Sequence, residues 1–97
     1  MAEQISVIIK APGESARRTA IQNDLRSLQQ AVGGFVEQVT LCNDLALLCN
    51  EEGRLQDLPH NCSICGLELC GTILLVGIKG EQFSDCPPVD AILWGLQ

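Results

Sequence analysis

The chain has 97 residues and a formal net charge of −6, from twelve acidic and six basic residues. This length allows one domain with a modest core. The charge argues against a nucleic-acid-binding face, which needs an extended basic stripe. Aromatic residues make up only 3% of the chain, so the core must be built from Leu, Ile, Val, Ala and Cys.

Two features of the sequence bear on the compartment. The N-terminal apolar run follows Glu3 and has no basic segment before it, so it is not typical of a signal peptide. The longest apolar run is far shorter than the roughly twenty residues of a membrane helix. We therefore expect a cytoplasmic protein without membrane contact. Its cysteines should be reduced or bound to metal, and three disulfides are the less favoured alternative.

Alternating apolar residues predict a strand over residues 5–9. Residues 11–14 predict a turn, because Pro12 fixes one backbone angle and Gly13 accepts a positive φ. We expect residues 17–21 to return as a second strand that pairs with the first.

The best-supported local element is a helix over residues 24–32. Asn23 is predicted as its N-cap, and Gly33 and Gly34 should end it. The apolar residues at helical spacing are Leu25, Leu28, Ala31 and Val32.

Two strands are predicted next, over residues 35–41 and 45–50, and the turn at Asn43 and Asp44 should join them as an antiparallel hairpin. The second of these strands is nearly all apolar, which indicates a position inside the sheet.

A further strand is predicted over residues 72–78, and a short C-terminal helix should start near Ser84 or Asp85. The whole chain, residues 1–97, is thus expected to form a single small α+β domain. Its sheet should be curved and mostly antiparallel, with one main helix and the short C-terminal one.

The segment Cys62-Ser63-Ile64-Cys65-Gly66 has the local form of a zinc knuckle. Structural zinc takes four ligands, and the further candidates are Cys70, His60 and Cys86. A second paired motif is absent from the sequence, and reduced thiols without metal are the favoured alternative. We keep Zn²⁺ as a candidate cofactor that would staple this segment.

A small anionic ligand is the second candidate for binding. Forked guanidinium groups suit such a ligand, and an amide could add a further contact. The candidate residues are Arg17, Arg18, Arg26, Arg54 and Asn50. Exposed arginines are, however, the norm. His60 has no Ser, Asp or second His at an informative spacing, so we do not expect an enzyme.

Three blocks of the sequence, taken in order, resemble a known family. They span residues 25–37, residues 49–61 with Cys49-Asn50-Glu51-Glu52-Gly53, and residues 71–84 with Gly71-Thr72-Ile73-Leu74-Leu75-Val76-Gly77. The family is domain of unknown function 3846, found in Gram-positive bacteria, their phages and mobile elements. The resemblance implies a single domain with a curved sheet and one main helix, and it brings no catalytic residues. The chain departs from the family pattern at residues 62–70, where relatives tend to have a longer polar loop without these cysteines.

We therefore expect a non-enzymatic accessory protein that acts by binding. The mobile-element setting implied by the resemblance favours a counter-defence role. The protein would either sequester a small signalling nucleotide between subunits or mask a basic surface of a host protein with its acidic exterior. The alternative is a zinc-stapled interaction module without a defence role. A homo-oligomer is also compatible with the small core and the sheet edges.

Overall fold

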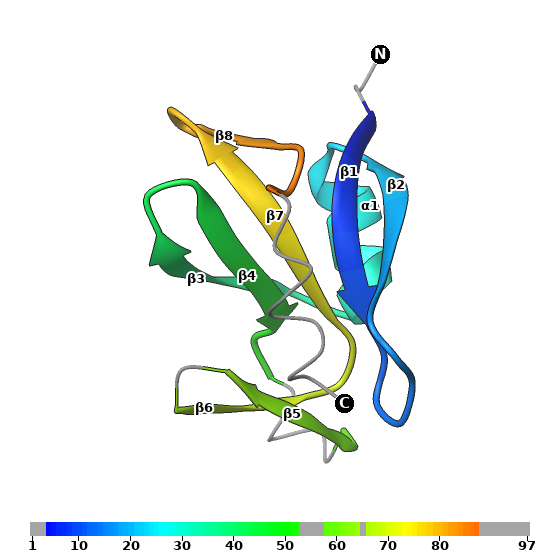
Figure 1. Cartoon of the computed structure of the whole chain (residues 1–97). Coiled ribbons are helices and arrows are strands. Elements are labelled where there is room, and N and C mark those ends of the chain that lie inside the picture. Colours follow the sequence, from blue (N-terminus) through cyan, green and yellow to red (C-terminus); the bar gives the residue numbers. More distant parts are fainter. Residues whose placement is uncertain (1–3, 53–57, 65, 88–97) are drawn as a thin grey trace.

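The computed structural model describes residues 4–52, 58–64 and 66–87 (Figure 1). Within these ranges the chain forms an α+β domain with a six-stranded antiparallel sheet, one helix and a separate two-stranded sheet. The elements in chain order are β1 (Gln4–Lys10), β2 (Arg17–Gln22), α1 (Leu25–Val32), β3 (Val36–Cys42), β4 (Leu45–Asn50), β5 (His60–Ile64), β6 (Leu67–Cys70), β7 (Ile73–Lys79) and β8 (Gln82–Ser84).

Strand β7 lies at the centre of the large sheet, whose order is β2-β1-β7-β4-β3. One side of β7 pairs with β4. The other side is shared, because β1 pairs with residues 73–75 and β8 pairs with residues 77–79. Figure 1 shows β1 and β7 diverging along the part of β7 that pairs with β8. The segment after β8 bridges this divergence: the Ser6 N–H donates to the Asp85 carboxylate at 2.7 Å, and the Cys86 N–H donates to the Ser6 carbonyl at 2.7 Å.

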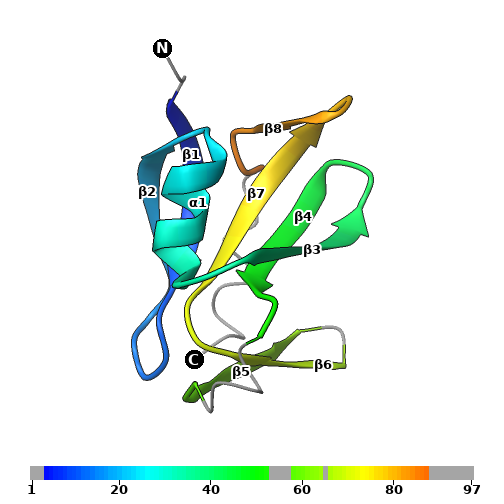
Figure 2. The same ribbon diagram turned by 180° about the vertical axis from the view of Figure 1, so that it is seen from behind.

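The central strands of the large sheet are buried on both faces. Helix α1 covers one face (Figure 2), where Leu28 and Val32 pack against Val7 and Leu74. The opposite face holds a second apolar cluster, in which strands of the sheet meet the small β5–β6 sheet. Successive side chains from Leu45 to Cys49 enter the two clusters alternately, and all six residues of β4 are buried.

The small sheet, β5–β6, was missed by the sequence analysis. It is an antiparallel pair with an irregularity between His60 and Cys62. Its apolar side chains Cys62, Ile64 and Leu69 are buried in the second cluster. The segment considered above for metal binding therefore also covers one face of the main sheet.

The helix confirms most of its predicted features, and two details were wrong. Its N-cap is Asp24, whose carboxylate accepts the Ser27 N–H at 2.7 Å, while the Asn23 amide donates to the Phe83 carbonyl. Leu25, the first residue of the helix, is 64% exposed, so the buried stripe consists of Leu28 and Val32. The helix ends as expected.

The end of the helix depends on two glycines. Gly33 adopts a left-handed conformation with φ of 81° and caps the helix. A Cβ on Gly34 would come within 2.8 Å of the Asn50 side-chain nitrogen, so the chain can pass close to β4 here. The structure thus explains why both residues are glycine.

The predicted hairpin of β3 and β4 is confirmed, with a bulge between Thr40 and Cys42. The strand predicted at residues 72–78 is confirmed as β7, and the pairing of the first two strands is confirmed as well. The predicted C-terminal helix falls largely on residues 88–97, which lie outside the described residues. Its expected start at Ser84 instead ends strand β8, which the sequence analysis did not predict, and residues 85–87 are not helical. Within residues 4–52, 58–64 and 66–87, no helix has the length and apolar character needed to cross a membrane.

Candidate functional site

Among the residues considered for anion binding, the four that the structure describes, Arg17, Arg18, Arg26 and Asn50, do not meet in one place. Arg17 pairs with Ile9 and Arg18 pairs with Ile8, so the two arginines lie on opposite faces of β2. Arg26 is exposed on α1. Arg54 lies outside the described residues.

Arg18 is engaged with the protein's own backbone. Its guanidinium donates to the Cys86 carbonyl at 2.9 Å, to the Pro87 carbonyl at 3.0 Å and to the Ser6 hydroxyl at 3.0 Å. The forked donors that were expected to suit an anion instead hold the segment after β8 against β1 and β2. These hydrogen bonds give Arg18 a structural role in the fold.

Asn50, the other predicted ligand, is buried at the junction of α1 and β4. Its amide nitrogen donates to the Val32 carbonyl at 3.3 Å, and its side-chain oxygen accepts the Glu52 N–H at 2.8 Å. The first contact satisfies a carbonyl at the end of the helix, which would otherwise lack a partner. Asn50 therefore joins the helix to the hairpin.

The candidate metal ligands that the structure describes differ in their surroundings. Cys62 and Cys86 are buried in the same apolar cluster, His60 is exposed, and Cys70 is half-buried opposite His60 in β6. Cys65 lies outside the described residues. Among residues 4–52, 58–64 and 66–87, no group of three or more His, Cys, Asp or Glu side chains is placed to hold a metal ion. The zinc site remains a prediction.

The environment of the buried thiols favours their protonated form. Burial raises the pKa of the Cys62 thiol, and the nearby Lys10 charge opposes this effect. Burial also raises the pKa of Cys49, with a further contribution from the negative charge of Glu37. Because thiolates are the nucleophiles and metal ligands, both thiols are made less reactive than an exposed cysteine.

A polar joint between Lys10 and Asn61 lies next to Cys62. The Lys10 side chain is only 5% exposed, and its ammonium donates to the Asn61 side-chain oxygen at 2.7 Å. The Asn61 amide nitrogen donates to the carbonyls of Lys10 and Gly71, both at 2.8 Å. Asn61 thereby connects the small sheet to the end of β1 and to the start of the link into β7.

The surface also has an open hollow of about 450 Å³ between β1 and β8. Its lining residues are Gln4, Ile5, Lys79, Gln82, Phe83, Ser84 and Asp85. The Asp85 carboxylate already accepts the Ser6 N–H, and the lining includes none of the candidate arginines. The hollow therefore does not form the anion pocket that the sequence suggested.

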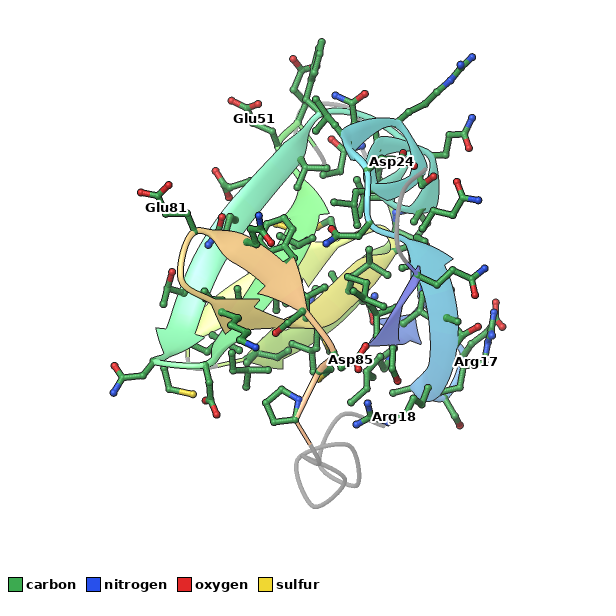
Figure 3. All side chains as sticks on the ribbon, turned by 90° about the horizontal axis from the view of Figure 1, so that it is seen from above. Arg17, Arg18, Asp24, Glu51, Glu81 and Asp85 are labelled. Carbon is green, nitrogen blue, oxygen red and sulfur yellow. The ribbon has the colours of Figure 1, made fainter. Side chains whose placement is uncertain are left out.

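Charge is distributed unevenly over the exterior. Residues 27–53 contain no lysine or arginine, and the exposed residues of this region include the acids Glu37, Asp44 and Glu51. Figure 3 shows Glu51 on the side of the molecule away from Arg17. The β3–β4 side thus presents exposed acids without a neighbouring cation from its own segment.

The described geometry is that of a small α+β domain with internally satisfied polar joints and an acidic side. A family model described as domain of unknown function (DUF3846) matches residues 5–94, and the chain belongs to this family. Neither a curated protein nor a solved structure shows significant similarity to the chain. The family assignment confirms the resemblance and leaves the function open.

Residues of the sequence blocks that resemble the family make contacts that hold distant parts of the fold together. Gly34 meets Asn50, and Asn61 bridges to Gly71. Sequence analysis missed the roles of Lys10 and Arg18. The role of Lys10 has a signal in the sequence, namely a lysine at the end of an apolar strand in a small domain. The role of Arg18 depends on a contact with a residue 68 positions away along the chain.

Proposed function

We propose that this protein is a non-enzymatic accessory protein that binds a basic surface of a partner protein with its β3–β4 side. The observation that supports this is the exposed acidic set Glu37, Asp44 and Glu51 in a segment without lysine or arginine. Complementary charge speeds association and selects among partners. In the mobile-element setting that the family resemblance implies, the partner would be a host protein, and masking it would be a counter-defence function.

Matched charge reversals test this proposal. Glu37→Lys changes the acidic side, and Glu14→Lys makes the same change of charge in the turn between β1 and β2. In affinity capture from host lysate, we expect the wild type and Glu14→Lys to retain one defined protein. Glu37→Lys should release it, and added salt should weaken retention. Equal retention by the two variants, or no retained protein, would overturn the proposal.

The nucleotide alternative remains open as a prediction. Its support is the set of arginines that the sequence provides. Arg17, Arg18 and Arg26 are exposed, and of these Arg18 is hydrogen-bonded to the protein's own backbone. A nucleotide that binds only the folded state at a hundredfold over Kd should stabilise the protein by roughly 2.7 kcal/mol. A thermal-shift screen with mononucleotides and cyclic nucleotides would detect this stabilisation. The zinc alternative is tested by elemental analysis of protein purified without chelator, where substoichiometric metal would end it.

A further inference from the structure

We propose that the outer edge of β3 binds an extended, basic segment of the partner protein as an added antiparallel strand. This inference rests on the proposed function and names its docking mode. Within the described sheets, β3 pairs with β4 alone and ends the strand order opposite β2 (Figure 2). An edge of this kind can be extended by another chain through main-chain hydrogen bonds.

The register shows which backbone groups of β3 face outward. The Glu51 N–H donates to the Phe35 carbonyl at 2.8 Å, which marks Phe35 as a position directed toward β4. In an antiparallel pair such positions alternate, so Glu37 and Val39 also face β4. The N–H and C=O groups of the intervening residues Val36, Gln38 and Thr40 are directed away from β4. They form the main-chain donors and acceptors of the outer edge.

The two edges of the sheet differ in the features that discourage pairing with another strand. The β2 edge carries Arg17 and Arg18, and charged side chains of this kind blunt an edge. The sequence of β3, Val-Glu-Gln-Val-Thr-Leu-Cys, contains neither a basic residue nor proline. The side chains of Gln38 and Thr40 are exposed. The bulge lies near the end of β3, so residues 36–40 remain regularly paired with β4.

Charge selects a basic segment as the occupant. Glu37 lies within the regular part of β3, Asp44 follows its far end, and Glu51 lies opposite Phe35 at its start. If two copies paired β3 with β3, their acids would be brought together, and like charges across strands are unfavourable. A strand with lysine or arginine on the face of Glu37 would form opposite-charge pairs instead. Residues 36–40 set the length at about five residues.

Binding can be measured with a synthetic heptapeptide of alternating lysine and valine, with alternating glutamate and valine as its control. We expect the basic peptide to shift the amide resonances of Gln38 and Thr40 in the full chain, and the acidic peptide to leave them unchanged. Gln38→Pro removes one outward N–H and leaves the β4 ladder intact. It should weaken peptide binding by about fivefold or more, as expected for a lost hydrogen bond.

Ala20→Pro is the matched control, because the same alternation places the N–H of Ala20 at the outer edge of β2. The Ser6 N–H and C=O face residues 85–86, so its pair Ala20 faces away from β1. This variant should bind the basic peptide like the wild type. Glu37→Lys serves as a second variant if Gln38→Pro does not fold, and it should also weaken binding.

Several results would overturn the inference. These are shifts at β2 in place of β3, equal binding by Gln38→Pro and Ala20→Pro, or light scattering that shows a second copy on the edge. If lysate capture depends on Glu37 while Gln38→Pro retains the captured protein, the proposed function stands and strand addition fails. If neither capture nor peptide binding occurs, both fail.

Discussion

Gly77 in β7 lies against the backbone carbonyl of Asp85, so closely that a Cβ at position 77 would overlap with this oxygen. Gly77 pairs with Ser84 in β8, and the segment after β8 then runs to Ser6 in β1. The absence of a side chain at this position therefore allows the segment after β8 to reach β1. The hydrogen bonds of Asp85 and Cys86 with Ser6 join this segment, and so the last described strand, to the first strand.

The Gly77→Ala variant should lower the free energy of unfolding by roughly 1–3 kcal/mol, because backbone must move to make room for the methyl group. Urea denaturation measures this change. Gly80→Asn is the control, since a Cβ at Gly80 meets open space and asparagine tolerates the positive φ found there. Equal stability of the two variants would contradict the close approach.

The hydrogen bonds of Asn61 predict that two substitutions will lower the free energy of unfolding by unequal amounts. Asn61→Ala leaves the buried carbonyls of Lys10 and Gly71 and the Lys10 ammonium without this partner, which should cost roughly 1–3 kcal/mol. Lys10→Met keeps an apolar side chain of similar length and removes the charge with its desolvation cost, so its effect should be smaller. Denaturant titration compares the two, and a larger loss for Lys10→Met would refute this account of the joint.

Substitutions of the two neighbouring arginines of β2 should also differ in their effects on stability and hydrogen exchange. Arg18→Lys replaces a fork that contacts two backbone carbonyls by a single ammonium. We expect a loss of about 1 kcal/mol and faster hydrogen exchange at the Cys86 amide, which is bonded to Ser6. Arg17→Lys lies on the opposite face and should leave this exchange rate unchanged. The same increase in both variants would show that Arg18 does not secure the segment.

The helix cap predicts a pH dependence of stability. The hydrogen bond from the Ser27 N–H lowers the pKa of the Asp24 carboxyl below its usual range. A lowered pKa in the folded state means that the stabilisation is present above the unfolded value and is lost as pH falls through the folded pKa. Asp24→Asn keeps a capping oxygen without the charge.

The melting temperature of wild type should therefore exceed that of Asp24→Asn near neutral pH, and the difference should shrink as the pH falls below about 4. Asp44→Asn, in an exposed turn, serves as a comparison for the general loss of one negative charge. A difference that is independent of pH would exclude the carboxylate as the source of the effect.

The local pattern of the sequence predicted those elements whose cause is local. The alternation of Ile5, Val7 and Ile9 gave β1, and the glycines after Val32 gave the end of the helix. The hairpin of β3 and β4 followed from its turn residues. Each of these signals depends on neighbours within a few residues, which a single sequence displays.

What the sequence did not predict depends on contacts between distant segments. The cysteines of residues 60–70 suggested a metal site. This segment instead forms strands β5 and β6, and its packing depends on the apolar cluster that Cys62 shares with Ile8 and Leu75. The functional interpretation of Arg18 and Asn50 changed for a similar reason. Their hydrogen bonds reach backbone groups 68 and 18 residues away, and no spacing rule encodes such contacts.

The central position of β7 has a consequence for how the chain is made. During synthesis, β1 to β4 leave the ribosome well before residues 73–79, which supply the strand that lies between β1 and β4. Until then, the apolar inner borders of two separate hairpins have no native neighbour, so the nascent chain is most exposed to wrong pairing over that interval. A chaperone that holds the first fifty residues should therefore be released only once β7 has emerged.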